Sequence, residues 1–398
     1  MATFEVLIQK IFIKPHWNAD ALEIGSIGSH DGWQVVVKKD QYKTGDLVAY
    51  IGENAIVPEW ILKSYGFWNE EKNVGLLAGK QGNRVKAVKL RGAFSLGICL
   101  PVDKVDGQHF ISVPDGTTPE GAMLLLQEEQ DIAEDLGITK YEPPIPTQMS
   151  GELYNAGQAI TVNYDVENIK NWPDVIGEGE PVQITEKLHG ILCQIICVPF
   201  VGVGVDPSEH LLVSGDSHRR RYIGVASKGL GAAGLCFKHN DANKNNVYLR
   251  ATQKYWEGIA NGLSQMQITS NVVILGEVFG DGIQDLKYGM KNEIGFRVFD
   301  IYVGRRGLGR YLSCSELNIW CTWMHLEWVP VLYRGPFSKA LLEQHTQHTK
   351  STFDSNQVRE GVVIKSLSER EVPELGRVSL KSINEDYYLR RGTITEFN

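Results

Sequence analysis

Short segments in which apolar and polar residues alternate fill the first part of the chain. Turn sequences such as HDGW and KTGD separate them, and the segments are FEVLIQKIFI, ALEIGSIG, WQVVVKK, LVAYIGE, RVKAVKL and SLGICLPV. Alternation with a period of two predicts half-buried β-strands. Five or six short strands within about 100 residues predict a small β-barrel, which we place at residues 1–105.

A different pattern follows, in PEGAMLLLQEEQDIAEDLGITKYEPPIPTQMSG. Its acidic middle part predicts a helix that ends at Gly137, and YEPPIPTQ predicts a stiff, proline-rich connection. We therefore expect residues 106–150 to form a helical and proline-rich linker, with the domain boundary between residues 145 and 155.

Residues 151–398 return to strand patterns. VQITEKLHGILCQIICV predicts two strands that meet at Gly190, and further strands are predicted at VVILGEVFG, IGFRVFDIYV, REGVVIK and RVSLKS. Residues 336–350 predict a helix. This part of the chain therefore indicates a strand-rich α+β domain.

Composition narrows the class of protein. A chain of 398 residues with 42% hydrophobic and 22% charged positions is typical of a globular protein with two or three domains. The apolar runs are too short to span a bilayer and the N-terminus lacks the plan of a signal peptide, so we expect an intracellular protein without a membrane partner. Cys193 and Cys197 share a strand face without a second pair nearby, which favours reduced core thiols over zinc.

The charge of the chain limits how it could bind a polyanion. A net charge of −8 argues against binding over the whole surface, but basic clusters remain, and each could also be a solvated face. The clusters are Lys80, Arg84, Lys86, Lys89 and Arg91; Arg219, Arg220 and Arg221 in HRRR; Arg305, Arg306 and Arg310; and Arg390 and Arg391.

GLGAAG, with Gly229, Gly231 and Gly234, matches the dinucleotide-binding fingerprint G-x-G-x-x-G. That fingerprint requires a strand before it and a helix after it, and LCFKHNDANKNN does not start a helix. We predict instead a loop whose backbone approaches a ligand, with Ser227 and Lys228 at its entrance.

Polar side chains interrupt five of the apolar strands. They are Lys187, Glu277, Asp300, Glu360, Lys365 and Lys381, and Phe299 precedes Asp300. Lys187 alone could be a solvated residue at a strand end, and each of the others could be a salt-bridged strand residue. Five such strands in one domain favour a shared site.

These residue types suit nucleotide chemistry. A neutral lysine such as Lys187 can attack a phosphate. Glu360 could hold Mg²⁺, and Lys365 and Lys381 could neutralise charge on an α-phosphate. Phe299 offers a face for a purine, and Glu277 an acceptor for ribose hydroxyls.

The order of these segments resembles that of the covalent nucleotidyltransferases, which include RNA ligases, DNA ligases and mRNA capping enzymes. EKLHG resembles motif I, in which Lys187 would be adenylylated; ILGE resembles motif III, FRVFDI motif IIIa, EGVVIK motif IV and RVSLKS motif V. SKGLG is our candidate for motif Ia, with HRRR as a competitor. The resemblance implies an antiparallel nucleotidyltransferase domain.

Three features favour the RNA ligases within this superfamily. His189 stands where DNA ligases and capping enzymes usually have Asp, and the resemblance implies that Glu186 contacts the adenine amino group. Residues 382–398 are too few for a C-terminal OB domain. KTGDLVAYI and KLRGAFSLG instead resemble tRNA-binding-type OB domains, so the N-terminal barrel followed by a ligase domain is similar to the family-five RNA ligases.

Motif V departs from the family pattern Lys-x-Lys, because the sequence reads Ser379-Leu380-Lys381. Strand alternation places Arg377, Ser379 and Lys381 on one face. We therefore expect Arg377 to supply the missing cation.

The resemblance implies an ATP-dependent RNA ligase, a monomer that seals 3′-OH and 5′-phosphate ends through a lysine–AMP intermediate and uses Mg²⁺ or Mn²⁺. Its substrate would be RNA or an RNA/DNA duplex with a break, with nicks in duplex RNA as the expected form. The implied catalytic residues are Lys187, His189, Lys365 and Lys381; the nucleotide site is Glu186, Gly190, Ser227, Lys228, Glu277, Phe299 and Arg377; the metal ligand is Glu360; and Lys80, Arg84, Lys86, Lys89 and Arg91 would bind the nucleic acid.

Two alternatives stay open at this point. A DNA ligase or a GTP-dependent guanylyltransferase would share Lys187. A non-catalytic RNA-binding protein with an OB domain and a decayed ligase fold would explain Ser379.

Overall fold

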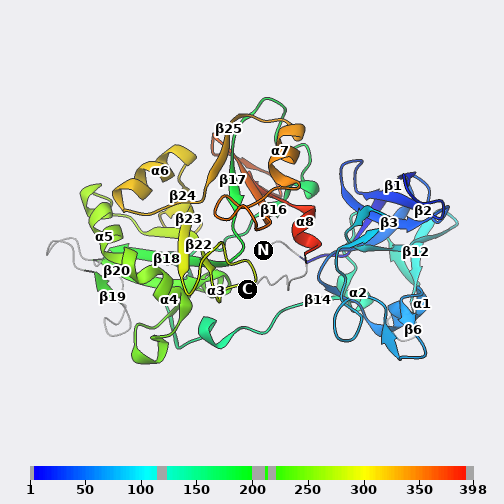
Figure 1. The fold of residues 1–398 in the computed structure, drawn as a ribbon, viewed down its shortest axis with the longest axis horizontal. Coiled ribbons are helices and arrows are strands. Elements are labelled where there is room, and N and C mark those ends of the chain that lie inside the picture. Colours follow the sequence, from blue (N-terminus) through cyan, green and yellow to red (C-terminus); the bar gives the residue numbers. More distant parts are fainter. Residues whose placement is uncertain (1–3, 114–122, 200–210, 214–220, 391–398) are drawn as a thin grey trace.

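The computed structural model describes residues 4–113, 123–199, 211–213 and 221–390. They form two lobes, an N-terminal lobe in blue and cyan and a larger C-terminal lobe in green to red (Figure 1). An extended segment after β14 (Thr139–Lys140) connects them. The lobes correspond to the two strand-rich regions that the residue pattern predicted.

The N-terminal lobe is built on a five-stranded antiparallel sheet. Its strand order is β10 (Ile98–Pro101), β4 (Leu47–Ile51), β1 (Leu7–Pro15), β2 (Leu22–Ile27) and β3 (Trp33–Lys38). The first half of β1 pairs with β4 and the second half pairs with β2, so β1 connects these two strands within the sheet. The Leu96 N–H donates to the Gln34 carbonyl at 2.8 Å, which ties β3 to the segment before β10. These pairings close the predicted OB-type barrel.

The remaining elements of the N-terminal lobe are short. They are β5 (Ala55–Ile56), α1 (Glu59–Ser64), β6 (Trp68–Asn69), β7 (Val74–Gly75), and the hairpin of β8 (Val88–Leu90) and β9 (Ala93–Ser95). Because β9 contacts β3, the hairpin is attached to the barrel wall.

The segment that we predicted as a helical linker differs from the prediction. It forms a small sheet of β11 (Asp103–Val105), β12 (Gln108–Ser112) and β13 (Met123–Leu126), followed by the one-turn helix α2 (Ala133–Leu136). The run MLLL pairs with β12 instead of continuing a helix. Only the predicted end of the helix is confirmed, since Gly137 has a left-handed φ of 68°. Leu126, Leu136 and Ile138 pack in the core of the N-terminal lobe, so this segment extends that lobe.

The C-terminal lobe contains two sheets. The six-stranded sheet has the order β19 (Leu211–Val213), β20 (Arg221–Ser227), β18 (Ile191–Pro199), β22 (Val272–Gly280), β23 (Ile294–Val303) and β24 (Arg310–Tyr311). The five-stranded sheet has the order β16 (Glu167–Asn168), β29 (Ser379–Ile383), β26 (Gly361–Ser366), β17 (Pro181–Lys187) and β25 (Val331–Pro336). All pairs in these two sheets are antiparallel except β16 with β29, which confirms the predicted antiparallel domain.

Helices cover the two sheets. α4 (Val247–Thr252), α5 (Trp256–Gln265) and α6 (Cys314–Trp323) pack on the six-stranded sheet, where Cys193 and Cys197 lie in the core as free thiols. α7 (Lys339–Thr346), within the predicted helix, packs on the five-stranded sheet, and α8 (Glu385–Tyr388) follows β29. Minor elements are β15 (Leu153–Asn155), β21 (Leu235–Phe237), β27 (Glu371–Val372) and β28 (Gly376–Arg377), with single 3₁₀ turns at Thr147–Met149, Gln158–Ile160, Ile169–Asn171, Asp241–Asn243 and Gln253–Tyr255.

GLGAAG does not form the predicted loop. It lies in α3 (Lys228–Ala233), which begins directly after β20 and ends at Gly234, with φ 81°. Ser227 caps this helix, because its hydroxyl accepts from the Leu230 N–H at 3.4 Å. The sheet around it is antiparallel, so the fingerprint does not mark a Rossmann fold.

Contacts among the described residues join the two lobes. The Trp33 indole N–H donates to Asn171 Oδ1 at 2.8 Å, and Lys339 Nζ pairs with Asp31 at 3.1 Å. The rings of Phe94 and Tyr388 lie 6.1 Å apart, which places the β8–β9 hairpin against α8. A cleft of about 1180 Å³ lies between the lobes, lined by residues of both.

Among the described residues, no helix has the length and apolar character that crossing a membrane requires.

Candidate active site

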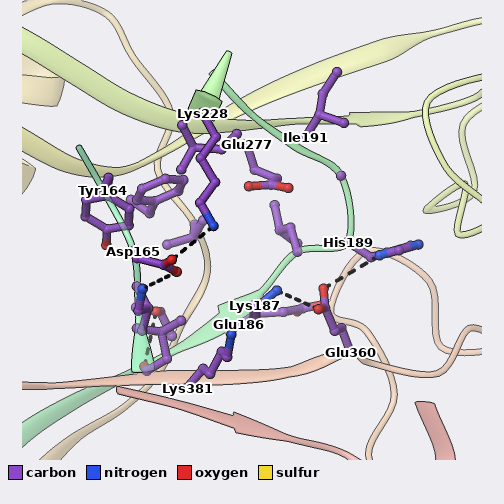
Figure 2. Close-up of a pocket in the computed structure, with 18 of the residues that line it drawn as sticks. Tyr164, Asp165, Glu186, Lys187, His189, Ile191, Lys228, Glu277, Glu360 and Lys381 are labelled. Carbon is purple, nitrogen blue, oxygen red and sulfur yellow. Dashed lines mark hydrogen bonds and ion pairs between the residues drawn. The ribbon is translucent and has the colours of Figure 1, made fainter. Parts of the chain in front are cut away.

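A pocket of about 140 Å³ lies where the two sheets of the C-terminal lobe meet, at the turn from β17 to β18 (Figure 2). The sequence predicts twelve residues that act in catalysis or bind the nucleotide or the metal ion, and ten of them line this pocket. They are Glu186, Lys187, His189, Gly190, Lys228, Glu277, Phe299, Glu360, Lys365 and Lys381. Side chains from strands far apart in the sequence therefore converge on one cavity.

Lys187 ends β17 and its side chain points into this pocket (Figure 2). Lys187 pairs with Gly361 in the sheet, so the preceding residue, Glu360, lies beside it. The Lys187 ammonium meets Glu360 Oε1 at 2.5 Å, and the two side chains are 24% and 5% exposed. The ion pair therefore fixes the direction of the Lys187 side chain beside a buried carboxylate.

The turn after Lys187 has room only for glycine at residue 190. A Cβ atom built there would lie 2.2 Å from the carbonyl oxygen of Val278 on β22. The close approach brings the β17–β18 turn against the six-stranded sheet, with Glu277 of the same strand among the pocket residues. Gly190 therefore fixes the distance between the two walls of the pocket.

Asp300 anchors the opposite wall. It is fully buried and accepts from Lys365 Nζ at 2.7 Å, from the Tyr164 hydroxyl at 2.7 Å and from Arg377 at 2.7 and 3.0 Å. Burial by itself would raise the pKa of Asp300, but Arg377 and Lys365 overcome it and lower the pKa to about 2. The Lys365 ammonium is thus fixed at the pocket by a permanently charged carboxylate.

Glu186 is buried beside Lys187. Its Oε2 accepts from the Thr352 N–H at 2.9 Å and from the Thr352 hydroxyl at 2.7 Å. Its Oε1 is also buried and has no hydrogen-bond partner among the described residues. One oxygen of the carboxylate is therefore fixed and the other is left for a donor from outside the chain.

Comparison with known sequences decides the family. The model of the RNA ligase family matches residues 180–383, which contain the strands that carry these side chains. The chain belongs to the RNA ligase family. A second model, for an OB-fold domain, matches residues 5–102 of this ligase. Among curated proteins, none matches the sequence.

Solved structures of an RNA ligase from Naegleria gruberi share the fold of the whole chain. A mutant with ATP and Mn is 24% identical with a TM-score of 0.70, over 96% of this ligase and 98% of that chain. The structure with PPi is 24% identical with a TM-score of 0.70, over 98% and 99% of the two chains. A mutant with AMP and Mn is 24% identical with a TM-score of 0.70, over 97% and 98%. Both lobes are therefore shared.

Two residues predicted for the nucleotide site of the ligase lie outside the pocket. Ser227 is buried as the cap of α3. Arg377 lies between Asp300 and Glu369, and it donates to the Glu369 carboxylate at 2.7 and 2.6 Å. Arg377, Ser379 and Lys381 do line one side of the cleft between the lobes, as strand alternation predicts. Arg377 is nevertheless committed to two carboxylates, so it does not replace the missing lysine within the pocket.

Ser379 shows what the departure in motif V does to the ligase. Its hydroxyl is buried and has no hydrogen-bond partner among the described residues. Lys381, two positions later, lines both the pocket and the cleft, and it forms no ion pair with any described residue. Lys381 is therefore the cation of this strand that remains available.

The residues predicted to bind nucleic acid do not form one stripe. Lys80, Lys89 and Arg91 are exposed and Lys86 is half-buried. Arg84 is buried, donates to Asn54 Oδ1 and stacks 3.6 Å from the ring of Tyr141. Its guanidinium holds the barrel to the segment that leaves it, so the prediction for Arg84 is wrong.

The other basic clusters are only partly described. Arg219, Arg220 and Arg391 lie outside the described residues. Arg221 is buried and donates to the carbonyls of Ile268 and Ser270, a structural role. Lys228 of SKGLG does line the pocket, where it pairs with Asp165 at 3.2 Å (Figure 2). Lys228 thus brings the SKGLG segment to the site, and its assignment to motif Ia stays a prediction.

Sequence reasoning missed the pocket residues of the segment before β16. This segment lines the pocket with Tyr164, Asp165 and Val166, and the ring centres of Tyr164 and Phe299 are 5.2 Å apart. In NYDVEN the apolar residues Tyr164 and Val166 do alternate with polar residues, but no polar residue interrupts an apolar run there, and only the tertiary structure brings this segment to the site. In the described part of the chain, no group of three or more His, Cys, Asp or Glu side chains could hold a metal ion by itself.

Proposed function

We propose that this RNA ligase uses ATP to seal 3′-OH and 5′-phosphate ends, at nicks in duplex RNA, through AMP carried on Lys187. The observation that supports this best is the position of Lys187 in the pocket of about 140 Å³, 2.5 Å from Glu360 and in the same lining as Lys365 and Lys381. The Naegleria gruberi RNA ligase of the same fold was solved with ATP, AMP and Mn.

The pocket suits an adenine nucleotide. Phe299 offers a flat face, and Val363 lines the pocket as well. The unpartnered Glu186 Oε1 would accept the adenine amino group, whereas guanine presents a carbonyl at that position and would leave the acceptor unsatisfied. Glu277 would accept from the ribose hydroxyls.

In the first step, Lys187 Nζ loses a proton and attacks the α-phosphorus of ATP. A nitrogen–phosphorus bond forms as the bond to the bridging oxygen of the β-phosphate breaks, and pyrophosphate leaves. Lys365 and Lys381 neutralise the charge on the α-phosphate. The resulting lysine–AMP keeps the nucleotide in the pocket.

Glu360 would hold the divalent cation, Mg²⁺ or Mn²⁺. Its Oε2 is buried and has no hydrogen-bond partner among the described residues, which fits a cation bound partly through water. When bound, the cation screens the charge of the triphosphate so that a nucleophile can approach it. Within the chain, Glu360 also holds the Lys187 side chain toward the pocket.

Two further transfers complete the reaction. A 5′-phosphate end attacks the AMP phosphorus and releases Lys187, and the 3′-OH then attacks the activated 5′-phosphate and releases AMP. The N-terminal lobe would hold the duplex through Lys80, Lys86, Lys89 and Arg91, which contact phosphates irrespective of sequence. Six free cysteines and the use of ATP fit an intracellular enzyme.

Intact mass after incubation with ATP and Mg²⁺ tests the proposal. We expect a gain of one AMP, no gain with GTP, no gain for Lys187→Ala, and a full gain for the control Lys63→Ala, which removes an exposed lysine of α1. A GMP adduct would move the protein to the guanylyltransferases. No adduct from folded protein, with Mn²⁺ also tried, would contradict the proposal and favour a binding protein.

The adenylylated protein can also be used to test whether the enzyme ligates RNA or DNA. We expect the adenylylated protein to seal a nick whose 3′-OH strand is RNA and to leave an all-DNA nick open. Equal sealing of both duplexes would contradict the assignment to RNA.

A further inference from the structure

His189 is held by residues that do not line the pocket. Its side chain is 4% exposed, and Nε2 lies 2.7 Å from Asp285 Oδ1. Nδ1 lies 2.9 Å from the Tyr387 hydroxyl on α8. Both ring nitrogens therefore have protein partners, and the imidazole cannot turn without breaking one of them.

The partners determine the hydrogen-bonding pattern of the neutral ring. A carboxylate only accepts, so the proton of a neutral imidazole is on Nε2 and points to Asp285. Nδ1 is then the acceptor for the Tyr387 hydroxyl. The ring edge that carries Nδ1 faces Glu360, whose Oε2 is 3.8 Å away (Figure 2).

Arg390 ties the two partners together. It donates to both oxygens of Asp285, at 3.0 and 2.9 Å, and its guanidinium stacks 3.6 Å from the centre of the Tyr387 ring. Burial alone would raise the pKa of Asp285, but hydrogen bonds from His189 and Arg390 lower it well below its usual range, so Asp285 is a permanent anion. Asp285, Tyr387 and Arg390 thus form one clamp around the imidazole.

We propose that Asp285, Tyr387 and Arg390 are positioning residues that fix His189 against Glu360, the partner of Lys187, and that the reaction that needs His189 depends on them through His189 alone. The inference rests on the function proposed above. The clamp comes from two places far apart in the sequence, the β22–β23 connection with Asp285 and the helix α8 with Tyr387, which Arg390 follows. α8 also meets the N-terminal lobe, where Tyr388 faces Phe94, so the clamp stands at the junction of the two lobes (Figure 1).

A double-mutant cycle tests whether the clamp acts through His189. Tyr387→Phe removes the hydroxyl and keeps the ring on which Arg390 stacks, and Asp285→Asn keeps the shape and removes the charge. Each is made alone and together with His189→Ala. Two single-turnover rates are measured, that of lysine–AMP formation from ATP and that of sealing of an RNA nick by adenylylated protein. The reaction that His189→Ala slows is then used as the reporter reaction for the other variants.

We expect Tyr387→Phe and Asp285→Asn each to slow the reporter reaction about five- to tenfold, because the free energy of one hydrogen bond corresponds to a rate change of that size. The KM for ATP should not change. In the His189→Ala background neither should slow it further. Tyr333→Phe is the matched control, because its hydroxyl contacts the Pro336 carbonyl on β25, and its rates should equal those of the parent. Thermal unfolding of every variant shows whether it is folded. If Asp285→Asn does not fold, the double-mutant cycle is completed with Tyr387→Phe alone.

Losses that multiply with that of His189→Ala would overturn the inference, as would a His189→Ala variant with normal rates in both reactions. These results leave the lysine–AMP adduct of the parent protein intact. Absence of that adduct in the parent is a different failure, because it overturns the proposed function itself.

Discussion

At the scale of single residues, buried carboxylates organise the site. Asp300 holds Lys365, and Glu360 holds Lys187, so each of these two cations has an anion that fixes its direction. Arg377 shows the cost of this arrangement. It was the expected replacement for the missing lysine of motif V, but its charge is needed to compensate Asp300.

Arg377→Met should therefore act on stability more than on phosphate chemistry. Removing Arg377 leaves the buried Asp300 charge to Lys365 and the Tyr164 hydroxyl, and losing a partner of a buried ion pair costs up to about 3–5 kcal/mol. Urea unfolding measures this loss. Arg310→Met is the control, because the exposed pair of Arg310 with Glu316 is worth at most about 1 kcal/mol. Equal losses in the two variants would contradict the role given to Asp300.

The pH dependence of stability follows from the same carboxylate. The folded-state pKa of Asp300, about 2, lies below the unfolded value of about 4. Its contribution is therefore complete above about pH 4 and is lost as the pH falls toward 2. Urea unfolding of the parent at pH 5, 4 and 3 should show stability decreasing across that window, and Asp300→Asn, although less stable, should show a shallower decrease. An equal slope in both proteins would refute this assignment.

At the scale of elements, the turn between β17 and β18 joins the two sheets, and the pocket lies at this junction. Lys187 is the last residue of one strand, and Gly190 brings the start of the next strand against β22. The turn is therefore both the place of the proposed nucleophile and the spacer between the walls of the pocket.

Gly190→Ala should push the turn away from β22, because a Cβ atom there would lie 2.2 Å from a backbone oxygen. We expect lysine–AMP formation to slow by at least about tenfold, as displacements of about 1 Å at a reacting centre do. Gly177→Ala is the matched control, since nothing lies within 4 Å of its added Cβ atom. Unchanged adduct formation in Gly190→Ala would show that the turn adapts.

At the scale of the whole molecule, an acidic protein presents exposed cations on the lobe that carries the barrel. Lys80, Lys89 and Arg91 remain available there, whereas Arg84 is buried. The β8–β9 hairpin, which carries Lys89, also meets α8 beside the proposed clamp. A duplex held on this side would thus lie close to the end of the chain that positions His189.

Reversing the charges of Lys80, Lys89 and Arg91 to Glu should leave lysine–AMP formation intact and weaken nick sealing. The loss should be larger at low salt, because phosphate contacts release counterions. Lys244, Arg250 and Lys254, exposed on the C-terminal lobe, changed together to Glu form the control with the same net charge. Equal losses of adduct and sealing would refute the division of labour between the lobes.

The sequence alone determined the barrel, the antiparallel domain and most of the pocket. Strand alternation and polar residues within apolar strands are local signals, and they identified Lys187, Glu277, Phe299, Glu360, Lys365 and Lys381 because each stands in a regular strand or, for Glu360, directly before one. The same local signals misjudged MLLL and GLGAAG, since pairing with β12 and capping by Ser227 depend on neighbours that periodicity does not reveal.

Only the tertiary structure decided which charges are free and which are used. The sequence predicts that Arg84 binds nucleic acid and that Arg377 serves the nucleotide site, but in space Arg84 meets Asn54 and Tyr141, and Arg377 meets Asp300 and Glu369. The clamp of Asp285, Tyr387 and Arg390 on His189 joins positions about 100 to 200 residues apart. Such partners are set by how strands and helices pack and not by any local pattern, because hydrogen bonds and ion pairs act over a few ångströms in space whatever the separation along the chain.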